Sequence, residues 1–432
     1  MQQSIGKYRW TICGLVFFAT TINYLDRSVI SLLKSTLSNE FTWNETDYAN
    51  IVVAFQLCYA VGLLGAGRLI DKLGTKIGYG LATALWSVAA IAHAAATSTF
   101  GFFVARGALG ITEAGNFPAA IKTVAEWFPK KERALATGIF NSGANIGAIL
   151  APLTVPFIVV IWGWQWAFIL TGLTGFIWLI LWLAVYEVPG KQKKLSQAEY
   201  EYIHSDEDES SSTGNSDSIK LSWAQLLGYR QTWAFAVGKF LTDPVWWFYL
   251  FWLPDFLEKQ YGLTNTQIAL PVALAYTMAT IGSIVGGWLP MYFIKKGWTV
   301  FRARKTAMVI YACCALPVVS AQYLGSINMW LAVLIIGLAM SAHQAWSANI
   351  YTTVSDLFPK TAVASVTGIG GMFGALGGIL IAKTAGNLFD YYKADGHIET
   401  GYLIMFLVCS VAYVIAWIIM QLLVPKMKRI VA

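Results

Sequence analysis

Twelve apolar stretches run along this chain, each about as long as the ~20 residues that an α-helix needs to cross the hydrocarbon core of a bilayer. They cover residues 9–34, 49–70, 76–96, 100–124, 134–160, 164–187, 231–255, 266–292, 303–322, 327–353, 360–384 and 400–424. Charged residues make up only 12% of the 432 residues, whereas a soluble domain carries about 25%. The sequence therefore predicts an all-α polytopic membrane protein with twelve transmembrane helices.

Lysine and arginine residues are distributed unevenly over the two sides of these predicted helices. With an even number of spans both termini lie on one side, and that side carries 23 of the 30 basic residues. The opposite side carries only Lys34, Lys259 and Lys393. Because basic residues collect in cytoplasmic loops, we expect both termini to be cytoplasmic. The net charge of +7 then reflects topology, and we expect no nucleic-acid partner.

A polar segment between the sixth and seventh stretches divides the chain into two halves. The pattern predicts an N-terminal six-helix bundle over 1–189, a cytoplasmic linker over 190–230 and a C-terminal six-helix bundle over 231–432. Within the linker, Ser196 and Glu199 have the spacing of a capping box that opens a short helix. The following run SDEDESSSTGNSDS has the composition of a disordered segment.

The two halves contain matching segments at an offset of 230 residues. Residues 126–150 (EWFPKKERALATGIFNSGANIGAIL) align without gaps to residues 356–380 (DLFPKTAVASVTGIGGMFGALGGIL), with FPK and TGI at the same positions. Parallel repeats of six helices, related by an axis along the membrane normal, build the two halves of major facilitator transporters. The repeat therefore predicts two pseudo-symmetric six-helix bundles, the major facilitator fold.

Two predicted spans each contain a pair of charged residues with special weight: Asp26 and Arg27 in the first, and Arg106 and Glu113 in the fourth. A charge at bilayer depth costs roughly 2.5 to 3.5 kcal/mol, so such residues usually face a cavity or a protein partner. Asp26 and Arg27 point about 100° apart on a helix and cannot pair with each other. We expect pairs between helices, Asp26 with Arg106 and Arg27 with Glu113 or a substrate. A purely structural ion-pair network is the alternative.

The loop after the second span reads GRLIDKLGTK, residues 67–76. It matches the major facilitator signature G-x-x-x-D-(R/K)-x-G-x-(R/K) at every fixed position, namely Gly67, Asp71, Lys72, Gly74 and Lys76. Asp71 can accept hydrogen bonds from a helix N-terminus. The match implies that residues 67–76, here called the gating loop, form a cytoplasmic latch between the halves; a plain charged turn is the alternative.

Several further segments resemble the anion:cation symporter family, and within it the bacterial hexuronate transporters. They include NYLDR at 23–27, EWFPKKERA at 126–134 and the seventh-span run GKFLTDPVWWFYLFWLPDFL. The resemblance covers nearly the whole chain except the acidic linker. It implies that Asp26 and Glu113 couple transport to protons and that Arg27 binds the substrate carboxylate, to which the arginine fork is well suited.

Sugar sites combine aromatic faces with amide and hydroxyl groups, and the spans contain both. The candidate substrate-binding residues beside Arg27 are Tyr24, Tyr59, Arg106, Asn141, Asn145, Trp246, Trp247, Tyr249, His343, Gln344, Trp346 and Asn349. Most aromatic residues of membrane proteins serve packing or interface belts, so packing is the alternative for each. Lys239 and Asp243 are four residues apart, and an intrahelical ion pair explains them; a role of Lys239 near the anion stays open.

We therefore predict a secondary active transporter, not an enzyme: a proton-coupled importer of a sugar acid such as glucuronate or galacturonate in a bacterial inner membrane. Its expected partners are a small organic anion, a proton and the bilayer, with no cofactor or metal, and it is expected to be a monomer. The first alternative is a symporter of another organic anion, an aldonate or aldarate. An antiporter of a phosphorylated solute is less favoured, because Lys239 and Arg27 lie at different depths. For a membrane enzyme or receptor, no nucleophile–base set, metal-ligand set or phosphate loop is present.

Overall fold

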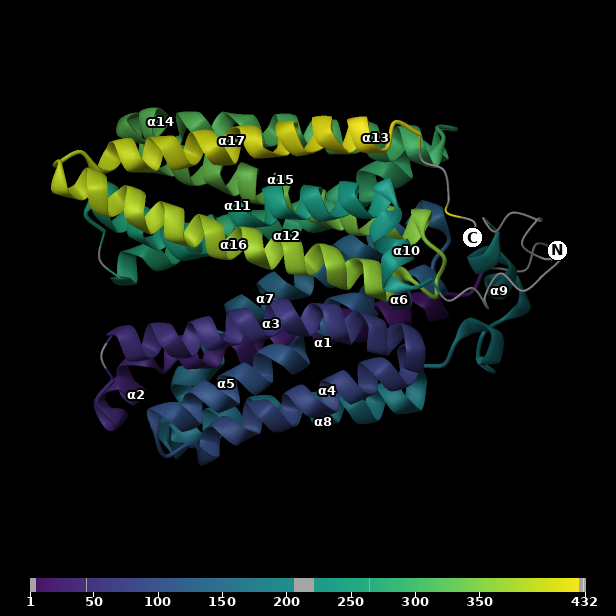
Figure 1. Ribbon diagram of the computed structural model, residues 1–432, viewed down its shortest axis with the longest axis horizontal. Helices are drawn as coiled ribbons and strands as arrows, with labels where there is room; N and C mark the ends of the chain where they lie inside the picture. Colours follow the sequence, from purple (N-terminus) through teal and green to yellow (C-terminus); the bar gives the residue numbers. More distant parts are fainter. Residues whose placement is uncertain (1–4, 44, 206–220, 264, 427–429, 431–432) are drawn as a thin grey trace.

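The computed structural model describes residues 5–43, 45–205, 221–263, 265–426 and 430, and every regular element among them is a helix. The long helices run along the longest axis in two bundles that lie side by side (Figure 1). Both termini lie at the same end of the molecule (Figure 1). We call this the terminal end and the opposite one the distal end. Two bundles with both termini at one end match the predicted major facilitator fold.

The first bundle corresponds to the first six predicted spans. Its long helices are α1 (Tyr8–Leu32), α3 (Glu45–Leu73), α4 (Thr75–Ala92), α5 (Thr99–Glu113) followed by α6 (Asn116–Trp127), α7 (Lys130–Trp162) and α8 (Trp164–Val185). Two short elements, α2 (Lys34–Phe41) and η1 (His93–Ala95), lie in its connections. The linker contains η2 (Pro189–Lys191), α9 (Gln197–His204) and α10 (Trp223–Gly228).

The second bundle corresponds to the last six predicted spans. Its helices are α11 (Arg230–Tyr261), α12 (Asn265–Lys295), α13 (Val300–Ala315) continued by η5 (Leu316–Ser320) and α14 (Ala321–Ile327), α15 (Met329–Leu357), α16 (Val363–Ala394) and α17 (Ile398–Leu423). Within the described residues, nine helical segments are by themselves long and apolar enough to cross a membrane. The other three predicted spans correspond to α1 and α11, which carry several charges, and to the interrupted pair α5 and α6.

The fourth span is broken in two, which corrects the prediction of one helix over 100–124. Proline has no backbone N–H, so Pro118 cannot donate to the carbonyl of Ala114, and α5 ends at Glu113. The amide of Gly115 instead donates to the Thr112 carbonyl at 3.4 Å, in a tighter turn. The break places the buried Glu113 at the end of a helix, in the middle of the first bundle.

The predicted internal repeat is confirmed at two equivalent helix junctions. Phe128 before Pro129 ends α6, and Phe358 before Pro359 ends α15, both with extended backbone. A residue before proline is driven out of the helical region, which explains why both helices stop there. The glycine-rich helices that follow, α7 and α16, both pack across the boundary between the bundles, α7 against α12 and α16 against α3.

The predicted linker helix is confirmed as α9, and its residue Glu199 makes contacts that the sequence did not predict. The Ser196 hydroxyl accepts a hydrogen bond from the Glu199 amide at 3.3 Å, which caps the helix. The Glu199 carboxylate does not complete a capping box. It accepts instead from the amides of Tyr8 and Arg9, each at 3.1 Å, and from Arg9 Nη1 at 3.0 Å. The linker thus caps the start of α1; the acidic run predicted to be disordered lies mostly in residues 206–220, outside the described part of the chain.

We expect Glu199→Ala to destabilise the first bundle. Glu199 is 1% exposed, and loss of one partner from a buried ion pair costs about 3 to 5 kcal/mol because the other charge is left unpaired. Thermal unfolding of the purified protein in detergent should show a lower midpoint. Glu201→Ala on the exposed face of the same helix is the matched control and should leave the midpoint unchanged; equal melting of both variants would contradict the predicted capping role.

Candidate functional site

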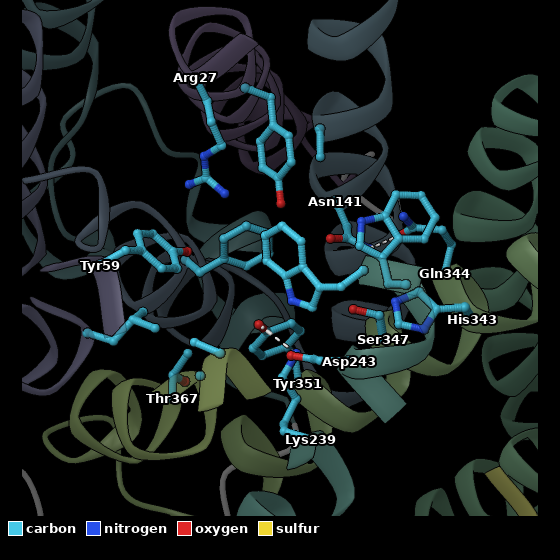
Figure 2. A pocket seen from close by; sticks show the side chains of 18 residues that line it. Arg27, Tyr59, Asn141, Lys239, Asp243, His343, Gln344, Ser347, Tyr351 and Thr367 are labelled. Atoms are coloured by element: carbon cyan, nitrogen blue, oxygen red, sulfur yellow. Dashed lines mark hydrogen bonds and ion pairs between the residues drawn. The ribbon is translucent and has the colours of Figure 1, made fainter. Parts of the chain in front are cut away.

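Two connected cavities lie between the bundles. The outer cavity has a volume of about 600 Å³ and extends from the middle of the molecule to residues at the distal end, among them Lys34 and Tyr48. The inner pocket, of about 70 Å³, is lined by side chains of both bundles (Figure 2). The two share the lining residues Tyr24, Arg27, Ala144, Trp246 and Trp247. A ligand entering from the distal end therefore meets Arg27 before it reaches the inner pocket.

Arg27 is held in place by an acid and by aromatic rings. Its Nε and Nη2 atoms both lie 3.0 Å from Oε2 of Glu113, which is the predicted pairing between the first and fourth spans. The guanidinium carbon lies 4.7 to 4.9 Å from the ring centres of Tyr24, Phe55 and Tyr59. Such cation–π contacts fix the orientation of a cation without neutralising it. Arg27 is therefore a preorganised cation at the junction of the two cavities.

The predicted pair of Asp26 with Arg106 is not formed. Arg106 lines the outer cavity, and its Nη2 donates to the backbone carbonyl of Arg27 at 2.7 Å. Asp26 is 1% exposed, and neither carboxylate oxygen has a hydrogen-bond partner at ordinary distance within the described residues. Asp26 is not among the residues that line either cavity. The prediction failed because it named the two helices that meet but did not include the direction in which each side chain leaves its helix.

Amide side chains connect the two bundles beside the inner pocket. Gln344 of α15 accepts from Asn141 Nδ2 at 2.7 Å and donates to Asn145 Oδ1 at 3.3 Å, both on α7. Asn141 and Gln344 line the inner pocket, and Asn145 lines the outer cavity. These three predicted residues are therefore brought together, with amide groups that a bound hydroxyl can also engage.

Trp246 and His343 form one aromatic wall of the inner pocket. Their rings stack with centres 5.2 Å apart and an angle of 16° between planes. Nδ1 of His343 lies 2.7 Å from the Tyr413 hydroxyl on α17. The ring edge of His343 thus bonds to a neighbouring helix, and its ring face stacks on Trp246. A sugar ring can pack on the tryptophan.

Three predicted residues do not reach either cavity. Trp346 and Tyr249 are 1% and 2% exposed, and Asn349 donates to two backbone carbonyls of α12 and α15. The cavity face of α15 is formed instead by Ser347 and Tyr351, together with the predicted His343 and Gln344. Residues four and eight positions after His343 share its helix face, so helical spacing was the signal that would have found these two.

Lys239 and Asp243 form the expected ion pair, and both line the inner pocket. Lys239 Nζ lies 2.7 Å from Oδ2 of Asp243 and donates to the Tyr351 hydroxyl at 2.9 Å. Figure 2 shows this group on the wall opposite Arg27. The pocket is therefore lined by a cation–acid pair from the second bundle, facing the cation of the first.

The gating loop connects the bundles at the terminal end. Asp71 accepts from the amide and the hydroxyl of Ser365, at 2.7 and 2.6 Å, in the first turn of α16. Lys122 Nζ lies 3.0 Å from the other Asp71 oxygen. Amides in the first turn of a helix have no partner within it, so the carboxylate satisfies one of them across the boundary, as the sequence predicted.

The other residues of the gating loop have different surroundings. A Cβ atom on Gly67 would overlap the Ala364 backbone of α16, and Gly74 has φ = 80°, a conformation that favours glycine. Lys76 Nζ lies 2.9 Å from Glu187, and its hydrogen bond lowers the pKa of that carboxyl. Lys72 is exposed. Gly67 and Asp71 therefore make the contacts between bundles.

A second close backbone contact between the bundles, of α7 with α12, has the same geometry as the contact of α16 with α3. A Cβ on Gly138 of α7 would overlap the Ser283 carbonyl of α12, just as one on Gly368 would overlap Leu63 of α3. Charges also join the bundles: Arg133 Nη1 and Arg304 Nε lie 3.3 and 2.5 Å from the carboxylate of Asp356, a pairing that the sequence did not predict. The terminal end is thus closed while the cavity extends to the distal end.

The chain is similar to known transporters along most of its length. The family model of the Major Facilitator Superfamily matches residues 16–382. The hexuronate transporter of Escherichia coli (strain K12) is 36% identical over 389 residues, which cover 90% of this chain and 89% of that protein. The galacturonate transporter of Dickeya chrysanthemi is 39% identical over 291 residues, or 67% of this chain and 84% of that protein.

Among solved structures, the proton:xylose symporter XylE bound to 6-bromo-6-deoxy-D-glucose matches with a TM-score of 0.77 and 16% sequence identity, over 98% of both chains. At this identity the likeness concerns the fold alone. Together with the family match and the curated relatives, the two bundles and their central cavity identify a multi-pass membrane transporter. The chain belongs to the major facilitator superfamily.

Proposed function

We propose that this chain is a proton-coupled importer of a hexuronate, such as glucuronate or galacturonate, in a bacterial inner membrane. The observation that carries the proposal is Arg27, a half-buried cation at the junction of the two cavities that is surrounded by aromatic rings and amides. A carboxylate suits the arginine fork, and ring hydroxyls suit the amides. The hexuronate and galacturonate transporters found as relatives support this choice of substrate.

The uneven distribution of basic residues supports cytoplasmic termini. With that orientation the terminal end is cytoplasmic, and the structure is closed to the cytoplasm and open toward the periplasm. Substrate then enters from the distal end, and release requires the gating-loop contacts to separate while the distal ends approach. Rocking of two bundles around a fixed site is the general mechanism of such folds. Because the cavities lie between two bundles of the same chain, we propose that the monomer is the working unit.

Proton coupling follows from the bond between Arg27 and Glu113. While Glu113 is ionised, two of the guanidinium donors of Arg27 point at its Oε2 atom. Protonation of Glu113 removes that charge and leaves the Arg27 donors available to a substrate carboxylate. Proton and anion therefore favour each other's binding, which is the linkage that a symporter needs. Asp26 is buried, and its carboxylate has no hydrogen-bond partner among the described residues; it is proposed as a second acid of the coupling path.

We expect Glu113→Gln to separate transport from its driving force. In proteoliposomes with an inward proton gradient, wild-type protein should accumulate labelled glucuronate, and the variant should lose about tenfold or more of that accumulation while exchange of internal for external substrate continues. A neutral glutamine resembles the protonated acid, so binding survives but the proton is no longer carried.

Glu201→Gln on the exposed linker helix is the matched control and should accumulate like wild type. Equal accumulation by Glu113→Gln would move the coupling role to Asp26 or elsewhere. Absence of wild-type uptake, or competition only by an aldonate or aldarate, would retain the transporter family and replace the substrate.

A further inference from the structure

We propose that Asp243 acts as a charge filter in the inner pocket: it accepts the hydroxyl groups of a monocarboxylate sugar acid and rejects a second carboxylate at the same place. This inference rests on the proposed function and assigns a specificity role to a residue pair that an intrahelical salt bridge would otherwise explain. It predicts that hexuronates are preferred over aldarates, which carry a carboxylate at both ends.

Charged residues lie on two opposite walls of the inner pocket. Arg27 lies on the wall formed by the first bundle, and Lys239 with Asp243 lies on the opposite wall, formed by α11 (Figure 2). A sugar acid whose carboxylate binds Arg27 therefore directs its other end toward α11. The group that α11 presents decides what that end of the substrate can be.

Both residues line the pocket, but the acid is the more exposed of the two. The side chain of Lys239 is only 3% exposed, whereas that of Asp243 is 19% exposed. The lysine ammonium is enclosed by Asp243 Oδ2 at 2.7 Å, the Tyr351 hydroxyl at 2.9 Å and the face of the Tyr351 ring at 4.1 Å. Oδ1 of Asp243 accepts no hydrogen bond from the described residues, so it remains an acceptor for a ligand.

An ionised carboxylate can only accept hydrogen bonds. It therefore binds the hydroxyls of a sugar ring, and these bonds are strong because one partner is charged. A second carboxylate at this place offers no proton and meets a like charge, because Asp243 is the one acid among the described residues that line the pocket. Lys239 cannot turn to a dianion without leaving both Asp243 and Tyr351. Like-charge juxtaposition is a general means of excluding a wrong partner.

The test measures the ratio of the affinities for two ligands, because a variant that is partly misfolded loses affinity for both and keeps the same ratio. Purified protein would be titrated with glucuronate and with glucarate, which differ at the end opposite the shared carboxylate. In wild type we expect glucarate to bind about tenfold or more weaker, the order of effect that one unfavourable charge contact produces. In Asp243→Asn the acid is gone and Lys239 is exposed to the ligand, so the preference should fall about tenfold or reverse.

The double variant Lys239→Gln/Asp243→Asn is the matched control for folding, because it removes both charges and leaves no buried ion unpaired. It should also lose the preference for glucuronate, since the repulsion is gone. If the pair is only structural, the double variant keeps the wild-type ratio of affinities, and that result overturns the inference. Equal binding of glucuronate and glucarate by wild type overturns it as well.

The proposed function fails in a different way. Wild-type protein that binds neither acid would refute both the hexuronate assignment and the filter that rests on it. Wild-type protein that binds glucuronate, with a ratio of affinities insensitive to both variants, would retain the hexuronate assignment and refute the role of Asp243 alone.

Discussion

Arg27→Gln is expected to abolish sugar-acid binding at ordinary substrate concentrations. Among the described residues, Arg27 is the one cation that lines both cavities, and the change also leaves the buried Glu113 without its ion-pair partner. Truncating one side of a buried hydrogen-bonded charge pair costs about 2 to 5 kcal/mol, which is about 30-fold or more in affinity. Calorimetric titration of the purified protein with glucuronate would measure the loss directly.

Two further variants separate charge from geometry and from folding. Arg27→Lys keeps the charge but not the planar fork, so we expect an intermediate affinity. Arg27→Gln/Glu113→Gln removes both charges and should fold at least as well as the single variant, yet still bind glucuronate weakly. If the double variant bound glucuronate like wild type, Arg27 would serve the structure of the first bundle, and the substrate carboxylate would bind elsewhere.

The membrane spans and the fold were predictable because they depend on local properties of the sequence. Span length follows from bilayer thickness, and the shared FPK and TGI of residues 126–150 and 356–380 place equivalent junctions in each half. The main local error was the fourth span, where the effect of Pro118 on the carbonyl of Ala114 was overlooked. A strong hydrophobic pattern predicts which residues cross the membrane, but it does not predict a break in the helix that they form.

The candidate site was only partly predictable, since it depends on the rotation of each helix. Arg27 with Glu113 was foreseen because two buried charges on different spans each need a partner. The same reasoning predicts a partner for Asp26, but its carboxylate has no hydrogen-bond partner among the described residues, and Arg106 instead donates to the Arg27 carbonyl. For α15, residue type alone favoured Trp346, but its indole is 1% exposed and packs against Tyr413 of α17 instead of lining the pocket.

Contacts that close the terminal end carry no local signal at all. Asp356 meets Arg133 and Arg304, which lie 223 and 52 residues away in the chain. Each residue, seen alone, resembles an ordinary charge at the end of a membrane span. Asp71 was the exception, because its loop signature is specific enough to predict a partner at a helix N-terminus.

Gly67→Val is expected to open the terminal end and to reduce uptake strongly. A side chain at this position would overlap the Ala364 backbone of α16, and backbone cannot move aside without separating the bundles. Overpacking costs about 1 to 3 kcal/mol, enough to shift the ratio of open to closed molecules by about 5- to 150-fold. Gly368→Val, which would meet Leu63 of α3 at the same contact, should have the same effect.

Spin labels on the exposed residues Lys72 and Lys296 would report the separation of the bundles, in a background without the exposed Cys313. The distance between them should lengthen in both valine variants. Gly65→Val is the matched control, because it lies two residues from Gly67 on the same helix and a Cβ there meets nothing within 4 Å. A control that opens as far as Gly67→Val would mean that residue volume on α3, and not the close contact with α16, sets the closed state. An unchanged distance in Gly67→Val would show that Asp71 and Asp356 keep the terminal end closed without the glycine contact.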